Sequence, residues 1–145
     1  MSRSGYSDDL DNWALIKWRG AVASATKGAR GQAMLRELLA ALGAMPEKEL
    51  VEDALVTAEG EYCALGVLGA ARGLDMTKVD PEDRKAVAQL FGVAPALIAE
   101  IVFENDDDFG CYYPDNEVTA QSRKRNRWWR MRAWVEAQII KEKVS

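Results

Sequence analysis

The sequence predicts an all-α fold: one compact helical domain of five to six helices that spans residues 1–145. Three observations lead to this prediction. Apolar residues recur at helical spacing through most of the chain. Capping residues, glycines and prolines divide that pattern into segments of helix length. The 145 residues, 48% hydrophobic and 29% charged, have the size and composition of one globular domain with its own core.

The first helix is expected to begin after Ser7, because Ser7 can cap it and the acidic residues at 8, 9 and 11 favour its N-terminus. Its apolar face is wider than a single stripe. The stripe carries Leu15, Trp18, Val22 and Ala25, and beside it lie Trp13 and Ile16. Residues 26–31 interrupt the pattern and predict a loop.

A second helix is indicated by apolar residues at i, i+1, i+4, i+5 and i+8 from Met34 to Leu42, and Gly43 ends it. Residues 47–56 leave two interpretations open, a helix or one arm of a small β-hairpin near residues 50–62. The next helix runs from Cys63 to Arg72. Its small residues would let a neighbouring helix approach closely, so we place it in the centre of the core.

Three further elements follow. Asp80 and Pro81 predict a helix start, and that helix ends at Gly92. Another helix begins near Pro95, and residues 104–110 predict an acidic loop. A last helix covers about residues 119–143. Its buried stripe is expected to hold Trp128, Met131, Val135 and Ile139.

The chain contains no histidine. This absence removes the commonest general base, the commonest zinc ligand and the usual partner of a serine or cysteine nucleophile. The two cysteines, Cys63 and Cys111, cannot form a disulfide framework. Cys63 opens an apolar helix and is expected to be an inert core thiol. We therefore expect no enzymatic activity, no metal site and no cofactor.

The N-terminus predicts a cytoplasmic protein. It leads directly into acidic residues and shows no secretory signal. No apolar run approaches the roughly 20 residues that a membrane helix needs, so no membrane association is expected.

The net charge of −4 conceals an uneven distribution. Residues 1–45 hold six Lys/Arg and four Asp/Glu, residues 46–118 hold five and seventeen, and residues 119–145 hold eight and two. A basic C-terminal part beside an acidic middle has two interpretations. The C-terminal helix packs against the middle and neutralises it, or the two charged surfaces recognise a charged partner.

The sequence around Gly92 has the spacing of a helix-turn-helix. Ala88 lies four residues before this glycine, Val93 follows it, and Ile98 and Ile101 lie six and nine residues beyond it. The second helix of the pair carries no side chain suited to reading bases, and its glutamates would repel phosphate. We therefore predict a helical hairpin of the core.

The basic and aromatic stretch 123–132 is the main candidate binding surface, because cations can hold a phosphate backbone or an acidic protein surface. Trp128 lies on the apolar stripe and Trp129 about 100° away, so we expect Trp128 in the core and Trp129 in solvent. A core stripe flanked by a solvated charged face is favoured over nucleic-acid binding for this stretch, which is still the best single candidate for a functional surface. The candidate partner-binding residues are Arg123, Lys124, Arg125, Arg127, Trp129, Arg130, Arg132, Glu104, Asp106, Asp107 and Asp108.

Two weaker patterns are set aside. Asp106, Asp108 and Gly110 suggest a calcium loop, but neither register fits an EF-hand. A start at Asp106 puts Gly110 at the fifth position, which needs an oxygen ligand, and a start at Asn105 puts Phe109 fifth and Asn116 at the twelfth position, which needs a glutamate. The glycines at 28 and 31 precede a helix whose amides could hold an anion. The spacing and the Lys-Ser/Thr end of a phosphate loop are absent there, so an ordinary connection is expected.

Most of the chain resembles small proteins encoded in phages and prophages of proteobacteria. The resemblance rests on residues 12–24 (NWALIKWRGAVAS), 31–42, 63–75 and 101–106, and on the tryptophan-containing C-terminal helix. It implies a phage origin, a bacterial cytoplasm and an accessory protein that engages a macromolecule.

From these observations we expect a non-enzymatic binding protein whose partner is a host or phage protein, with inhibition of a host defence protein as one role. The alternative is a nucleic-acid-binding protein that uses the basic C-terminal helix, together with Lys17, Arg19, Lys27 and Arg30. Homo-oligomerisation is left open.

Overall fold

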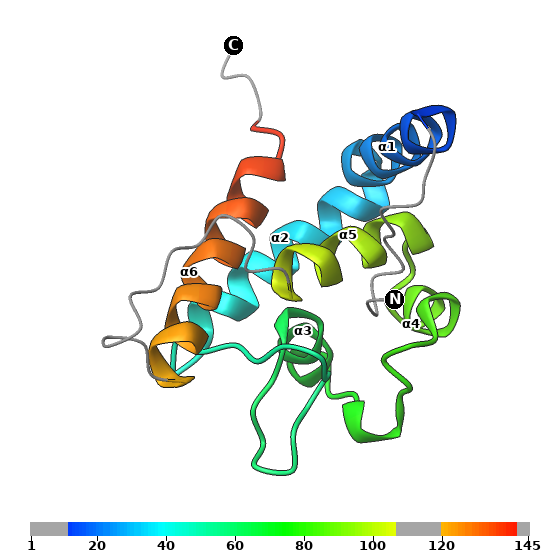
Figure 1. Ribbon diagram of the computed structural model, residues 1–145. Helices are drawn as coiled ribbons and strands as arrows, with labels where there is room; N and C mark the ends of the chain where they lie inside the picture. Colours follow the sequence, from blue (N-terminus) through cyan, green and yellow to red (C-terminus); the bar gives the residue numbers. More distant parts are fainter. Residues whose placement is uncertain (1–11, 107–119, 142–145) are drawn as a thin grey trace.

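The computed structural model describes residues 12–106 and 120–141 of the chain (Figure 1). Within those ranges it contains six α-helices, one short 3-10 helix and no strand. The prediction of an all-α fold is therefore confirmed. The elements are α1 (Asn12–Lys27), α2 (Ala29–Ala44), α3 (Ala64–Ala71), η1 (Met76–Lys78), α4 (Arg84–Phe91), α5 (Pro95–Asp106) and α6 (Ala120–Gln138).

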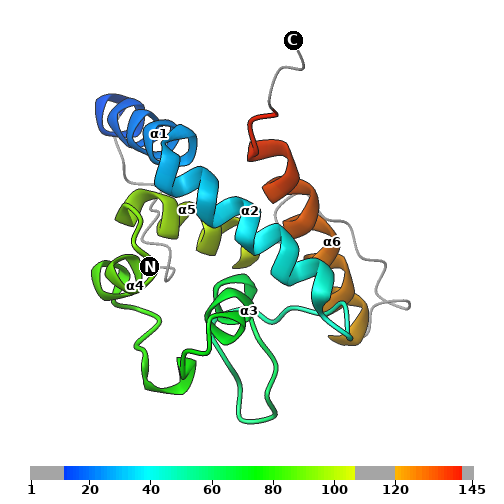
Figure 2. The ribbon, with the colours of Figure 1, turned by 180° about the vertical axis from the view of Figure 1, so that it is seen from behind.

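Two helices, α2 and α5, organise the packing. Helix α5 contacts α1, α3, α4 and α6, and α2 contacts α1, α3 and α6. Figure 2 shows α2 crossing the front of the molecule, with α1 at one of its ends and α6 beside the other. The buried core contains side chains from every α-helix except α1, whose Ala25 is partly buried against it.

The predicted loop at 26–31 is reduced to a one-residue break. Helix α1 continues to Lys27 and α2 begins at Ala29, which leaves only Gly28 between them. A Cβ on Gly31 would lie 1.9 Å from the carbonyl oxygen of Ala25, so glycine lets the two helices meet closely. The predicted helix start at Ser7 lies outside the described residues.

Gln32 ties three segments together at this break. Its Nε2 donates to the carbonyl oxygens of Thr26, at 2.8 Å, and Gln138, at 2.9 Å. Its Oε1 accepts from the backbone N–H of Ile140 at 2.8 Å. One buried amide therefore holds the end of α6 against the junction of α1 and α2.

Residues 45–63 form no helix, which settles the choice between helix and hairpin. A single antiparallel bridge pairs Val56 with Tyr62, and the Thr57 N–H donates to the carbonyl oxygen of Glu61 at 2.8 Å. The segment is a hairpin-like loop without strands. It packs tightly on α3, because a Cβ on Gly66 would lie 1.8 Å from the carbonyl oxygen of Leu55.

Helix α4 begins three residues later than the sequence predicts. Asp83, rather than Asp80, is its N-cap and accepts from the Ala86 N–H at 3.1 Å. The Asp80 carboxylate accepts from the N–H of Glu82, only two residues ahead, which makes a turn and not a helix start. The predicted stop is confirmed, since Gly92 has a left-handed backbone conformation with φ 71°.

Helix α5 continues through Asp106, so the expected loop does not begin at residue 104. The buried side chain of Asn105 explains the difference. Its Oδ1 accepts from the Ala64 N–H at 3.0 Å, and its Nδ2 donates to the Val51 carbonyl oxygen at 2.9 Å. These bonds hold the last turn of α5 against α3 and the hairpin-like loop.

The expected inner stripe of the C-terminal helix is confirmed. Trp128, Met131 and Val135 of α6 are at most 3% exposed, and Ile139 is partly buried against the core. Cys63 is also buried, as expected, and its sulfur caps the first turn of α3.

In the described ranges, no single helix combines the length and apolar character needed to cross a membrane. Helices α4 and α5 meet that criterion only as a pair, and they are bent by 106° relative to each other.

Candidate functional site

Helices α4 and α5 have the arrangement of a helix-turn-helix, but the second helix is covered. The two helices meet at 106° across Gly92, and the matching apolar positions Ala88, Val93, Ile98 and Ile101 are buried. Helix α5 is enclosed by α1, α3, α4 and α6. A helix packed on these sides cannot enter a DNA groove without unfolding its surroundings, so this motif is part of the core.

Arg127 is a structural residue, although the sequence placed it on the candidate binding surface. It is 3% exposed. Its Nε donates to the carbonyl oxygen of Asn105 at 2.8 Å, and its Nη1 donates to that of Leu50 at 3.2 Å. Its Nη2 lies 3.5 Å from the carboxylate of Glu52. A guanidinium used in this way is not available to a partner.

The two cations that precede Arg127 also face the acidic middle of the chain. Lys124 pairs with Glu61 at 2.5 Å, and Arg125 pairs with Glu49 at 3.4 Å. The hydrogen bond that Lys124 Nζ donates to Glu61 raises the pKa of the ammonium; desolvation opposes this rise, and the charges of nearby glutamates reinforce it. The first half of α6 therefore packs on the acidic middle, which was the first of the two interpretations of the charge distribution.

The other cations of the stretch are distributed differently. Arg123 is exposed and Arg130 is half-buried on α6. Arg132 pairs with Glu136 one turn later, at 3.2 Å. Trp129 is 59% exposed, as expected, and packs edge-on against Trp128 with ring centroids 4.9 Å apart.

The acidic residues of the candidate surface do not form a separate cluster in the described chain. Glu104 is half-buried on α5. The Oδ1 of Asp106 accepts from Asn105 Nδ2 at 2.8 Å and from the Asp53 N–H at 3.3 Å, so it belongs to the structural network of the loop. Asp107 and Asp108 lie outside the described residues.

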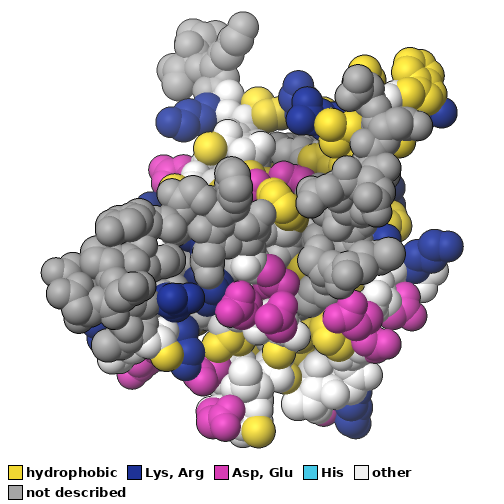
Figure 3. Space-filling view, viewed as in Figure 1, with side chains coloured by type: hydrophobic (Ala, Val, Ile, Leu, Met, Phe, Trp, Pro, Cys, Tyr) yellow, Lys and Arg dark blue, Asp and Glu magenta, His cyan; other side chains and the backbone are white. Residues whose placement is uncertain are grey.

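Of the large apolar side chains that the structure describes, the two most exposed lie on α1, which the sequence did not single out as a candidate surface. Trp13 is 66% exposed and Ile16 is 61% exposed. Figure 3 shows hydrophobic side chains gathered at the upper right, over the start of α1. The sequence did contain a signal for this surface. Trp13 and Ile16 lie beside the main apolar stripe of the helix, and this makes its apolar face unusually wide.

The described residues of α1 and of the first half of α2 are basic. Residues 12–36 contain five cations and no aspartate or glutamate. Lys17 Nζ lies 5.3 Å from the centre of the Trp13 ring, within the range of a cation–π contact. The five cations are Lys17, Arg19, Lys27, Arg30 and Arg36. We call Trp13, Ile16, Lys17 and Arg19 the α1 face.

The connection between α1 and α2 has the ordinary hydrogen bonding of a helix junction. The Gly28 N–H donates to the Ser24 carbonyl oxygen at 3.0 Å, so this amide is already used within the chain.

Among the residues that the structure describes, no group of three or more His, Cys, Asp or Glu side chains is arranged to hold a metal ion. Comparison of the chain with protein-family models, curated proteins and solved structures produced no match.

Proposed function

We propose that this protein is a non-enzymatic binding module whose α1 face docks onto a partner protein. The observation that carries the proposal is the exposure of Trp13 and Ile16, 66% and 61%, on neighbouring turns of one helix. Large side chains of this kind are the usual energetic anchors of protein interfaces, and tryptophan is enriched among them.

The free energy available from burying Trp13 and Ile16 is large enough to contribute to recognition of a partner. Full burial of a side chain of this size contributes about 1.5–3 kcal/mol. Because about two thirds of each side chain is still exposed, docking of both would contribute about 2–4 kcal/mol before the costs of association. That is enough to make the two residues necessary to an interface, but further contacts around them are required.

The charges around the α1 face define the chemistry of the partner. Lys17 and Arg19 are exposed on the same helix, and the described part of the chain up to Arg36 contains no carboxylate. A complementary surface would present an apolar recess flanked by aspartates or glutamates, which would also accelerate encounter. The resemblance to phage-encoded proteins supports a host or phage protein as the partner, and we propose inhibition of a host defence protein as the role.

Nucleic-acid binding is the second candidate, and the acid-free basic segment at 12–36 favours it. At the C-terminal helix the structure gives this function less support than the sequence did. Arg127 is buried there, and Lys124 and Arg125 pair with glutamates. An aliphatic side chain such as Ile16 also has no counterpart on a phosphate backbone.

The test is a pull-down from phage-infected host lysate treated with nuclease. It compares the wild type with a Trp13→Ser/Ile16→Ser variant. Trp129→Ser is the matched control, because Trp129 is similarly exposed but lies on α6. We expect a partner that the double variant loses and the control retains, with unchanged thermal unfolding of all three proteins. Retention by the double variant, or absence of any enriched protein, would contradict the proposal.

A direct binding measurement separates the second candidate. Fluorescence anisotropy with mixed-sequence DNA and RNA at low salt is expected to show no salt-sensitive binding by the wild type. Salt-sensitive binding that a Lys17→Gln/Arg19→Gln/Lys27→Gln variant loses would favour the nucleic-acid function instead.

A further inference from the structure

A cleft lies on a different part of the molecule, between the C-terminal end of α2 and helix α3. Its volume is about 490 Å³, within the range of small-molecule sites in proteins. One end is closed by the residues that follow α2 and by the hairpin-like loop. The lining residues are Ala41, Ala44, Met45, Pro46, Glu47, Glu49, Gly60, Glu61, Tyr62, Val67, Ala70 and Ala71.

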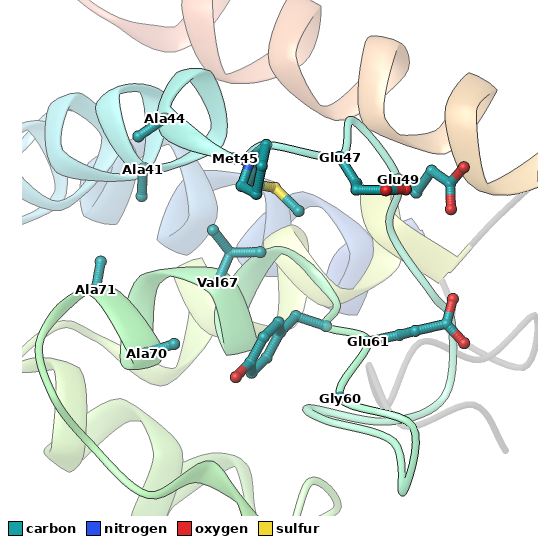
Figure 4. Close-up of a pocket in the computed structure, with 12 residues that line it drawn as sticks. Ala41, Ala44, Met45, Glu47, Glu49, Gly60, Glu61, Val67, Ala70 and Ala71 are labelled. Carbon is teal, nitrogen blue, oxygen red and sulfur yellow. The ribbon is translucent and has the colours of Figure 1, made fainter.

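The two ends of the cleft differ in chemistry (Figure 4). At one end, alanines of α2 face alanines of α3, and Met45 and Val67 approach each other between the two helices. At the other end lie three carboxylates, those of Glu47, Glu49 and Glu61. The lining contains no lysine or arginine.

The carboxylate end keeps a negative charge after its internal pairs are counted. Lys124 neutralises Glu61 and Arg125 neutralises Glu49, both from the side of α6. Lys48, between Glu47 and Glu49, donates from its ammonium to the carbonyl oxygens of Gly43 and Met45. Glu47 and Glu59 are exposed, so the four glutamates at 47, 49, 59 and 61 outnumber the three cations beside them, Lys48, Lys124 and Arg125. The two pairs with α6 also fix the positions of two of the carboxylates, because each is held by a cation outside the lining.

Small side chains leave the cleft open, and backbone contacts hold the loop that forms one of its walls. Alanine side chains on α2 and α3 are too short to cross the gap. The loop wall is held on α3 by the close approach of Gly66 to the Leu55 carbonyl and by the Cys63 N–H, which donates to that same carbonyl at 3.3 Å. A preformed concave site with an apolar end and a few polar groups is the usual form of a small-molecule site.

We propose that this cleft binds a small organic cation, a ligand with an apolar body and an ammonium or amidinium end. The body would lie between the alanines over Met45 and Val67, and the cation would lie beside Glu47, Glu49 and Glu61. This site is separate from the α1 face and does not depend on it.

Three probes of equal length test the charge requirement: 2-phenylethylammonium, 2-phenylethanol and phenylacetate. Binding is followed by the methyl ¹³C–¹H signals of Met45 and Val67. We expect saturable shifts with the ammonium, about tenfold weaker binding of the carboxylate, and weakening by salt only for the ammonium. Equal binding of all three probes, or no saturable shift with the ammonium, would overturn the proposal.

Two variants locate the site. Ala70→Leu fills the apolar end and is expected to abolish binding, whereas Ala133→Leu, at an exposed position of α6, is the matched control and should retain it. Glu47→Gln should weaken the ammonium alone. Since Ala70 and Ala133 are both exposed helix positions, unfolding should be unaffected, and circular dichroism checks this. Undiminished binding by Ala70→Leu would place the ligand elsewhere and refute the assignment.

Two other occupants of the cleft are distinguished by the same signals. The blocked dipeptide N-acetyl-Trp-Lys-amide carries an aromatic group and an ammonium on a peptide backbone. If it binds more than about tenfold more tightly than 2-phenylethylammonium, the ligand of the cleft is a peptide and not a small molecule. Shifts of the Met45 and Val67 methyls on dilution of the protein alone would instead identify a second copy of the chain. Either result would overturn the proposal.

Discussion

The strongest prediction concerns Arg127, the one cation of the basic stretch that the structure places in the interior. The guanidinium donates to the carbonyl oxygen of Asn105 in the last turn of α5, where helix carbonyls lack partners within the helix. It also donates to the Leu50 carbonyl oxygen, while the Leu50 N–H donates to the carbonyl oxygen of Lys124 at 3.1 Å. Arg127 therefore links α5, α6 and the hairpin-like loop.

Replacement by methionine keeps an apolar stem like that of Arg127 and removes the guanidinium with its donors. Two buried carbonyls then lose their partners, at about 1–3 kcal/mol each. Removal of a buried charge returns part of that cost. The contact with Glu52 contributes little, because that carboxylate is 50% exposed. We expect Arg127→Met to lower the free energy of unfolding by about 2–4 kcal/mol, and Arg127→Lys by about 1–3 kcal/mol.

The assay is urea unfolding followed by circular dichroism, with Arg125→Met as the matched control. Arg125 lies two residues away on the same helix, carries the same charge and is 61% exposed beside Glu49. Its replacement should change stability by less than about 1 kcal/mol. Equal losses for Arg127→Met and Arg125→Met would refute the conclusion that the buried hydrogen bonds matter. The lysine variant keeps the comparison measurable if the methionine variant does not fold.

Two further predictions concern backbone fit and pH. Gly66→Ala should destabilise the protein by more than about 2 kcal/mol, because its Cβ would meet the Leu55 carbonyl oxygen, whereas Gly43→Ala in α2 meets no atom within 4 Å and should stabilise it by about 0.5–1 kcal/mol. Thermal or urea unfolding of both variants tests this, and similar effects of the two would contradict it. The pKa of Lys124 is raised above its ordinary 10.5, so the stability from its pair with Glu61 is fully present below that pH and is lost above it. A Lys124→Met variant should therefore show a smaller loss of stability than the wild type between pH 10 and 12, and an identical pH profile would show that the pair has no effect.

Most of the helices could be predicted from the sequence because their determinants are local. The inner stripe of α6 follows from the spacing of Trp128, Met131 and Val135, and the end of α4 follows from Gly92. The start of α4 was placed wrongly because Asp80 and Asp83 are both good capping residues. Only the conformation of the intervening turn selects between them.

The binding surface was less predictable, because the fate of a polar side chain depends on distant segments. Arg125 and Arg127 are equivalent in the sequence, but the carbonyls that bury Arg127 belong to residues 50 and 105. Likewise, the apolar width of α1 was visible in the sequence. Which part of this apolar face is covered depends on how α2 and α5 pack against α1.

The sequence by itself determined an all-α domain with its main helices and inner stripes, because periodicity and capping act within a few residues. It also determined the excess of acid in the middle of the chain. Only the tertiary structure decided that the first half of α6 pairs with part of this excess, that Arg127 is interior, and that Trp13 and Ile16 remain exposed. The cleft between α2 and α3 is likewise a product of packing, since its walls come from segments that the sequence does not bring together.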